Sequence, residues 1–268
     1  MSTRRSIFIT GGGSGIGRAI AKYFGDRGYF VGVGDIDQTG MDETLALIGH
    51  GFTFAWKFDV RDRAAWGEAL DAFATAAGGR IDVLANNAGI PVGGSLVENT
   101  VDEIERCLDI NLKGVLFGAQ AAYPYLKAAA GGSCLLNTAS AAGIYGTPGA
   151  SVYSATKFGV RAITESLDGE WAEDAIKVRS LMPSFIDTPL LDHMPNSLTN
   201  QDIRQRVTEA GLEITPVEEV ARAAWDAVHG DRLHTTVGKT ARQLAFAARW
   251  MPGRLRRQMR TSMRPLGK

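Results

Sequence analysis

Three side chains in the middle of the chain could move a proton on and off a carbonyl oxygen: Ser140, Tyr153 and Lys157. If a helix begins near Tyr153, Lys157 lies one turn later on the same face, where the two side chains can meet. A free tyrosine titrates near pH ~10, and a neighbouring cation favours its phenolate form. Moving that titration to neutral pH takes roughly 4 kcal/mol, which a partly desolvated ion pair can supply. The three residues therefore predict an acid–base site.

The tyrosine–lysine spacing alone is weak evidence, because the chain has a second such pair in Tyr123 and Lys127. Tyr123 lies within a predicted helix, next to a proline, and has no hydroxyl residue at the matching distance. Tyr153, in contrast, follows a segment rich in glycine, alanine and serine that contains Ser140. We therefore assign Tyr123 to packing or to the surface, and Tyr153 to chemistry.

The elements that must position these residues follow a regular rhythm. Over the first 185 residues, short apolar runs alternate with helical segments, which predicts an α/β fold: a single-domain, Rossmann-like, doubly wound parallel sheet with helices on both faces. The predicted strands are residues 6–9, 29–34, 52–58, 82–86, 134–138 and 177–182. The predicted helices are residues 15–27, 62–77 and 153 to about 173, with two more from about residues 100 and 111 that are separated by a break. In such sheets, ligands bind beyond the carboxyl ends of the strands.

A glycine-rich loop, Thr10-Gly-Gly-Gly-Ser-Gly-Ile-Gly17, lies between the first predicted strand and the first helix. This context suits a dinucleotide pyrophosphate, because glycines let the backbone approach and a helix N-terminus attracts negative charge. Asp35, at the end of the second strand, can accept hydrogen bonds from the adenosine ribose and repels a 2′-phosphate. No Lys or Arg lies in the loop or directly after Asp35, so the sequence predicts NAD rather than NADP.

The composition describes a globular protein with one large core. The chain has 268 residues, of which 45% are hydrophobic and 22% are charged. No run of about 18 apolar residues predicts a spanning helix, and the first residues do not resemble a signal peptide. The two cysteines and four histidines lack metal-ligand spacing. We therefore expect reduced thiols, a cytoplasmic location and no metal.

The end of the chain is strongly basic. From Lys239 onward there are nine Lys and Arg residues and no acidic residue, although the whole chain has no net charge. Two short helices are expected here, broken at Pro252-Gly253, with a narrow apolar stripe formed by Leu255, Met259 and Met263. The stripe predicts docking on its own domain or on a neighbouring subunit, and contact with an anionic membrane is the alternative. No nucleic-acid binding is expected, since no aromatic residues interleave with the charge.

With these motifs, the chain resembles the classical short-chain dehydrogenase/reductase (SDR) family over roughly residues 5 to 240. The loop is similar to the family's Thr-Gly-x-x-x-Gly-x-Gly pattern, Asp59-Val60 to its adenine-contacting pair, and residues 86–89 to its Asn-Asn-Ala-Gly motif. Its catalytic tetrad is matched in order and spacing by Asn111, Ser140, Tyr153 and Lys157. The resemblance implies cofactor contacts at Gly11, Ser14, Gly15, Ile16, Gly17, Asp35, Asp59, Val60, Asn87, Tyr153, Lys157, Ile186 and Thr188.

The resemblance also implies a role for each member of the tetrad. Tyr153 is expected to be the acid/base, Ser140 to hold the substrate oxygen, and Lys157 to bind the nicotinamide ribose while lowering the pKa of the tyrosine. Asn111 is expected to hold a water that links Lys157 to solvent, although from the sequence alone it reads as a polar residue at a helix break. The chain departs from the family at Ser184, where a glycine beside the nicotinamide is common.

We expect a catalytic domain over residues 1–240, with a substrate segment at about 185–212, and a basic helical tail over 241–268. The segments that frame the pocket are largely apolar, and only the last of them contains arginines, Arg204 and Arg206. The sequence thus predicts an NAD-dependent oxidoreductase that interconverts a hydrophobic secondary alcohol and a ketone without a metal. An NADP-preferring carbonyl reductase, or a non-catalytic scaffold that senses a dinucleotide or is recruited to a membrane, is the alternative. The resemblance further implies a homo-oligomer, a tetramer or a dimer.

Overall fold

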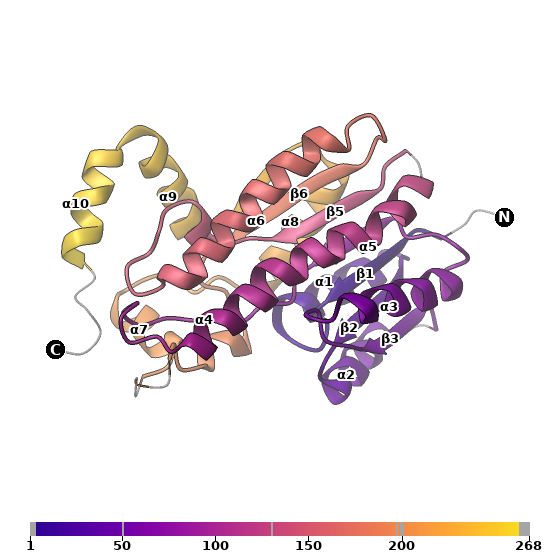
Figure 1. Cartoon of the computed structure of the whole chain (residues 1–268), viewed down its shortest axis with the longest axis horizontal. Helices are drawn as coiled ribbons and strands as arrows, with labels where there is room; N and C mark the ends of the chain where they lie inside the picture. The colour runs from indigo at the N-terminus through magenta and orange to yellow at the C-terminus, as the bar shows by residue number, and fades with distance from the viewer. Residues whose placement is uncertain (1–3, 50, 130, 197, 199–200, 263–268) are drawn as a thin grey trace.

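A computed structural model describes residues 4–49, 51–129, 131–196, 198 and 201–262. It contains one sheet of seven parallel strands in the order β3-β2-β1-β4-β5-β6-β7 (Figure 1). The strands are β1 (Ser6–Thr10), β2 (Phe30–Asp35), β3 (Thr53–Lys57), β4 (Val83–Asn86), β5 (Cys134–Thr138), β6 (Lys177–Pro183) and β7 (His234–Val237). The order runs outward from β1 in both directions, which is the doubly wound arrangement that the alternation predicts.

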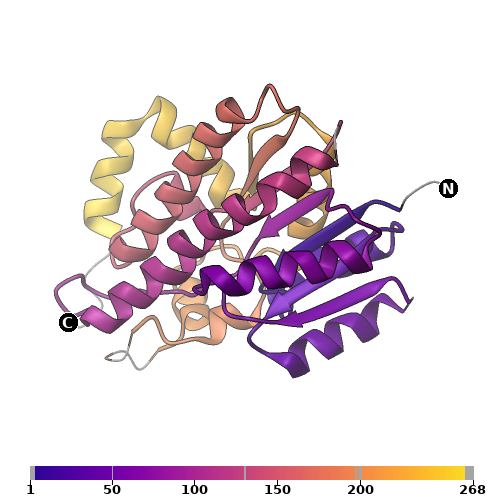
Figure 2. The same cartoon turned by 45° about the vertical axis from the view of Figure 1, so that its right-hand side comes forward.

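Helices cover both faces of this sheet (Figures 1 and 2), as expected from the sequence. On one face lie α1 (Gly15–Gly25), α2 (Gln38–Ile48) and α8 (Val217–His229). On the other lie α3 (Arg63–Ala76), α4 (Val101–Leu108), α5 (Gly114–Ala128) and α6 (Ser151–Glu170). Beyond the strand ends come α7 (Ile203–Glu209), α9 (Lys239–Trp250) and α10 (Pro252–Ser262). None of the helices in the described residues is long and apolar enough to cross a membrane.

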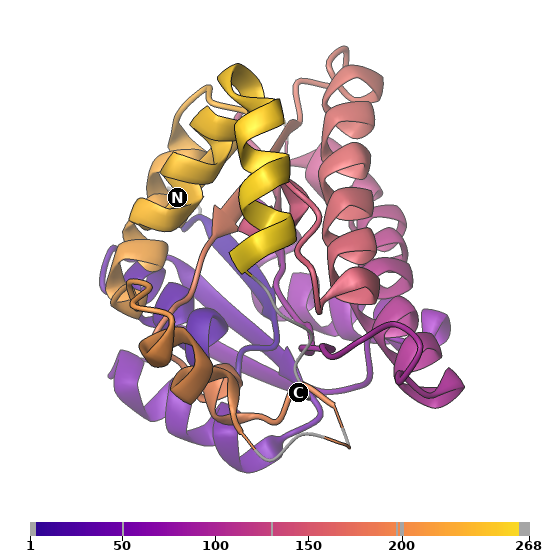
Figure 3. The same cartoon turned by 90° about the vertical axis from the view of Figure 1, so that its left-hand side faces the viewer.

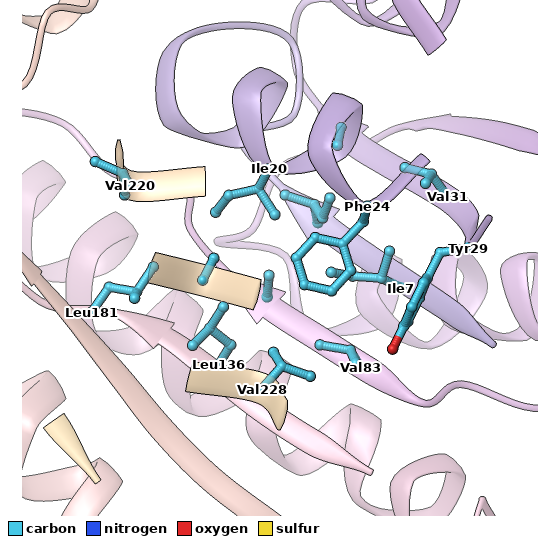
Figure 4. Packing of buried hydrophobic residues seen from close by; sticks show 14 of the residues in the cluster. Ile7, Ile20, Phe24, Tyr29, Val31, Val83, Leu136, Leu181, Val220 and Val228 are labelled. Carbon is cyan, nitrogen blue, oxygen red and sulfur yellow. The ribbon is translucent and has the colours of Figure 1, made fainter. Parts of the chain in front are cut away.

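The core is divided by the sheet because successive side chains of a strand point to opposite faces. On β1, Ile7 and Ile9 pack with Phe24 of α1 and with α8, whereas Phe8 packs with Trp66 and other residues on the opposite face. Figure 4 shows the first of these clusters, in which side chains from α1 and α8 close over the strands. Burying each such side chain contributes about 1.5–3 kcal/mol, so the central strands are firmly held.

Two features differ from the sequence-based expectation. The predicted break between two helices is a π-helical turn, η1 (Asp109–Lys113), so that the chain stays helical from Val101 to Ala128. The structure also adds α2, α7, α8 and the edge strand β7 to the predicted elements. β7 reads His-Thr-Thr-Val and is only half-buried over its first three residues, so it lacks the apolar run that revealed the central strands.

Gly118 on α5 provides a test of this packing. A Cβ at this position would lie 2.3 Å from Asn86 Oδ1 and 2.6 Å from a Trp66 ring carbon. We expect Gly118→Ala to lower the free energy of unfolding by about 1–3 kcal/mol, measured by urea denaturation. Gly67 in α3 is the matched control, because a Cβ at this position would meet nothing within 4 Å. Alanine at Gly67 should raise the free energy of unfolding by about 0.5–1 kcal/mol, since alanine favours a helix more than glycine does. Equal effects of the two substitutions would contradict the packing described for α5.

Candidate active site

The strand ends from β1 to β6 open onto one cavity of about 2360 Å³. Most of the residues singled out from the sequence line it, although they are spread over almost the whole chain. They are Gly11, Ser14, Gly15, Ile16, Asp35, Asp59, Val60, Asn87, Ser140, Tyr153, Lys157, Ile186 and Thr188. Gly17 and Asn111 do not line the cavity and lie behind its wall.

The glycine loop brings the N-terminus of α1 to this cavity. Gly11 has a φ of +65°, and a Cβ on Gly17 would lie only 2.1 Å from the Gly11 carbonyl oxygen. Gly17 therefore allows the close packing of helix on loop, and its contact with a cofactor stays a prediction. The Ser14 side chain makes no capping hydrogen bond to α1, so backbone N–H groups at the start of the helix stay available to a phosphate.

Asp35 lies at the carboxyl end of β2 and accepts hydrogen bonds from the backbone N–H groups of Gly13, at 2.9 Å, and Asp37, at 3.1 Å. Asp35 and Asp37 both line the cavity. The nearby Arg18 does not line it, because its guanidinium donates to the carbonyls of the loop and of α2 and to Glu43. Two carboxylates therefore lie together at this end of the cavity.

The neighbouring strand ends carry two further predicted residues. Arg61 donates to both carboxylate oxygens of Asp59, and these hydrogen bonds hold the pKa of Asp59 below its usual value. Asn87 donates to the carbonyl of Thr10 at 3.0 Å and accepts from the Thr138 hydroxyl at 3.2 Å. Asn87 thus ties the ends of β1, β4 and β5 together on the floor of the cavity.

Tyr153 and Lys157 lie in the first two turns of α6 and face the cavity together. The Lys157 ammonium is 5.6 Å from the centre of the Tyr153 ring, and it donates to the Thr138 carbonyl at 2.9 Å. Ser140 follows β5 and its hydroxyl accepts a hydrogen bond from the N–H of Ala142 at 3.1 Å. A substrate oxygen between Ser140 and Tyr153 could accept hydrogen bonds from both.

Tyr123 and Lys127, the competing pair, lie outside the cavity. The Tyr123 hydroxyl donates to Asp174 at 2.5 Å, Lys127 pairs with Asp174 at 2.8 Å, and the Tyr123 ring packs on Trp171. This arrangement joins α5 to the segment after α6 and confirms that Tyr123 has a packing role.

The expected lowering of the Tyr153 pKa by Lys157 is not seen in the protein alone. Burial raises the pKa of Tyr153 to about 12, and the partly opposing effect comes from a hydrogen bond with Ser140. Burial also lowers the pKa of Lys157 to about 8. Both shifts have the same cause, because removing water from the site disfavours the phenolate and the ammonium alike.

Asn111 lies in η1 and holds the loop that follows β4. Its amide oxygen accepts from the N–H of Ile90 at 2.8 Å, and its amide nitrogen donates to the Ile90 carbonyl at 2.9 Å. A Cβ on Gly89 would lie 3.2 Å from the Asn111 oxygen and 3.6 Å from the Lys157 ammonium. Asn111 is therefore next to Lys157, but its side chain is occupied by the backbone of Ile90. Its role in holding a water stays a prediction.

Ser184 lines the cavity, and its hydroxyl is hydrogen-bonded to the end of β7. Its hydroxyl donates to the Val237 carbonyl at 3.4 Å. A Cβ on Gly238 would lie only 2.4 Å from this hydroxyl oxygen, so the serine fits because residue 238 has no side chain. Gly238 has a φ of +90°. The serine is thus accommodated by a glycine at the start of the tail.

Comparison with known proteins places these features in a family. Residues 5–198 match the family described as short chain dehydrogenase. The chain belongs to the short-chain dehydrogenase family. The protein is therefore a nicotinamide-dependent oxidoreductase that acts on CH–OH groups and interconverts alcohols and ketones.

Individual relatives extend this comparison. Meso-2,3-butanediol dehydrogenase of Serratia marcescens is 34% identical over 76% of this chain and 78% of its own. The 3-alpha-(or 20-beta)-hydroxysteroid dehydrogenase of Mycobacterium tuberculosis is 35% identical over 78% of this chain and 77% of its own. Among solved structures, a 3-ketoacyl-(acyl-carrier-protein) reductase from Brucella melitensis, complexed with NADH, matches with a TM-score of 0.79 and 27% identity, over 90% of this chain and all of that one.

The tail of this short-chain dehydrogenase is part of its own active-site wall. Leu255 of α10 is 3% exposed, and together with Met259 it lines the cavity. The expected docking of the stripe on its own domain is thus confirmed for these two residues, while Met263 lies outside the described residues. Sequence reasoning missed the contribution to the cavity, since an apolar stripe shows that a helix docks but not where it docks.

The raised pKa of Tyr153 predicts that the cofactor-free protein keeps this phenol protonated well above neutral pH. The ultraviolet absorbance of phenolate, titrated in wild type and in Tyr153→Phe, isolates this one tyrosine. Because the neutral form is favoured in the folded protein, we expect the difference between the two titrations to stay flat from about pH 6 to 10. Circular dichroism over the same range serves as the folding control. A phenolate signal that appears near neutral pH and is lost in Tyr153→Phe would contradict this prediction. It would show that the charge of Lys157 affects the pKa of Tyr153 more than burial does.

Proposed function

We propose that the protein is an NAD-dependent dehydrogenase/reductase for hydrophobic secondary alcohols and ketones, with Tyr153 as the acid/base. The observation that carries the proposal is that one cavity has Ser140, Tyr153 and Lys157 on one wall and Asp35 at its acidic end. A dinucleotide laid along the strand ends would span these two groups, with its pyrophosphate at the N-terminus of α1.

Each side chain then has a defined task. When bound, the nicotinamide carries the hydride. Tyr153 gives a proton to the substrate oxygen during reduction and removes it during oxidation, and Ser140 holds that oxygen in place. Lys157, anchored by the Thr138 carbonyl, is placed to bind the ribose and to exchange protons with Tyr153. The two hydrogen bonds between the Asn111 side chain and the Ile90 backbone hold the loop next to Lys157 in position.

The preference for NAD over NADP rests on charge at the ribose. Asp35 and Asp37 both face the cavity there, and two carboxylates would repel a 2′-phosphate. Arg18 is engaged by Glu43 and a loop carbonyl, and Arg61, which lines the cavity, is engaged by Asp59.

The substrate end of the cavity is lined by apolar side chains, which supports a hydrophobic substrate. They come from the segment after β6 and from the tail helices, and include Leu190, Leu191, Val207, Leu212, Leu244 and Met251. The relatives named above act on secondary alcohols of very different size, as their names state. These relatives support the interconversion of an alcohol and a ketone but do not favour one substrate.

We further propose a cytoplasmic homo-oligomer, a dimer or a tetramer. Leu116 on α5 and Phe158 on α6 are 42% and 40% exposed, and we propose that these two helices form the interface between subunits. On α9, Phe246 and Trp250 are exposed beside arginines and support peripheral contact of the tail with an anionic membrane. Light scattering, and sedimentation with anionic vesicles, would each return a negative result if these assignments were wrong.

Reduction of NAD⁺ by a panel of secondary alcohols, including aromatic and steroid-like ones, tests the proposal. We expect turnover with NAD⁺ to exceed turnover with NADP⁺. Asp35→Ala should shift the ratio of kcat/KM values toward NADP⁺ by at least about tenfold, equivalent to ~1.4 kcal/mol. Asp26→Ala, at an exposed acid beyond the end of α1, should leave the ratio unchanged. A wild-type preference for NADP⁺ would support the carbonyl reductase alternative, and no turnover with either cofactor would support a scaffold.

A further inference from the structure

The cavity has charged side chains at both of its ends. Its acidic lining residues within the described part of the chain are Asp35, Asp37 and Asp59, at the ends of β2 and β3, where Arg61 and Arg106 also line the cavity near Asp59. The wall built by α7, α9 and α10 contributes three further arginines and no acidic residue: Arg206, Arg242 and Arg254. We call these three the arginine cluster. It lies beyond β6 and β7, far along the sheet from the ribose site and from the glycine loop after β1.

Another arginine of α7, Arg204, has a structural role. It is paired with Asp187 at 2.7 Å and with Asp192 at 2.6 Å. Within the described part of the chain, no ion pair or side-chain hydrogen bond is found for Arg206, Arg242 or Arg254. Arg242 and Arg254 are exposed and Arg206 is half-buried, and their guanidinium groups brace no element in the described part of the chain.

Arg206 carries this argument furthest. Its Nε is shielded from solvent and has no hydrogen-bond partner, and burial lowers the pKa of its guanidinium, a shift that Glu209 partly opposes. A donor withdrawn from water without an acceptor destabilises the fold. Arg206 also lines the cavity, so an anionic ligand there would supply the counter-charge that this half-buried guanidinium lacks.

The wall built by α7, α9 and α10 also has apolar side chains next to the arginine cluster. Leu255 is buried at the cavity, and Val207, Met251 and Met259 line it beside the arginine cluster. Figure 3 shows α10 in front of the sheet and above α7, and residues of both helices line the cavity. A ligand that fills this space meets apolar side chains along its body and positive charge at its far end.

We propose that the substrate is amphipathic, with a secondary alcohol or ketone at Tyr153, an apolar body, and a carboxylate or phosphate bound by Arg206, Arg242 and Arg254. This inference rests on the proposed function and replaces a wholly neutral hydrophobic substrate with an anionic one. It also gives the basic tail a task, because Arg242 and Arg254 reach the site only when α9 and α10 are folded over the cavity.

Binding of non-reacting probes to the full-length protein tests the cluster without relying on activity. Isothermal titration would compare a medium-chain fatty acid, the alkyl phosphate of the same length and the methyl ester of that acid. We expect wild type to bind the better of the two anions at least about tenfold more tightly than the ester, and the order of acid and phosphate identifies the head group. Arg206→Gln and the double substitution Arg242→Gln/Arg254→Gln should each remove most of that difference while leaving ester binding unchanged.

Arg249→Gln and Arg256→Gln are matched controls, since these arginines belong to α9 and α10 but do not line the cavity. Both controls should bind the anion as wild type does. Equal binding of anion and ester by wild type would overturn the proposal, as would an equal loss of anion affinity in the control variants. Neither result would touch the role of Tyr153, which is judged separately by turnover of neutral alcohols with NAD⁺.

A second readout links the cluster to catalysis. We would use hydroxy acids with the alcohol at the penultimate carbon, and their methyl esters, as substrates with NAD⁺. Substitution of the arginine cluster should raise KM for the acid about tenfold with little change in kcat, because the lost contacts lie far from the reacting carbon. A fall in kcat for acid and ester alike would show that the cluster only shapes the wall, and would contradict the proposal.

Discussion

The site depends on the parallel alignment of strands β1 to β6, which brings their carboxyl ends to one edge of the sheet. Residues far apart in the chain meet there only because the helices cover both faces and leave this edge open. Lys157 shows the dependence well. It is 4% exposed, and its ammonium is held by the Thr138 carbonyl at the end of β5. Without that strand end, a buried cation on α6 would have no partner of this kind.

Burial shifts the pKa values of Tyr153 and Lys157 in directions that the sequence did not reveal. In the protein alone, the phenol of Tyr153 is held neutral and the ammonium of Lys157 is made easier to deprotonate. A neutral phenol is the form that the proposed acid/base role of Tyr153 needs for ketone reduction. Alcohol oxidation needs a phenolate, and the positive charge of an oxidised nicotinamide is the additional interaction that would favour it.

The features that sequence predicted well are those encoded locally. The apolar strands, the glycine loop, Asp35 and the set of Ser140, Tyr153 and Lys157 each carry their signal within a few residues. What could not be predicted depends on contacts across the fold: the polar edge strand β7, the accommodation of Ser184 by Gly238, and the place where Leu255 docks. The direction of the Tyr153 pKa belongs to the same group, because it depends on how much water the surrounding wall excludes.

The central claim is that Tyr153 transfers the substrate proton in a cavity shared with the cofactor. The most direct measurement is single-turnover oxidation by Tyr153→Phe, on the best alcohol from the panel, with NAD⁺ binding measured in the same sample. Removing the one hydroxyl should lower the rate at least about 100-fold, while NAD⁺ binding changes little because the ring remains. A variant that binds NAD⁺ normally and turns over as fast as wild type would contradict the account.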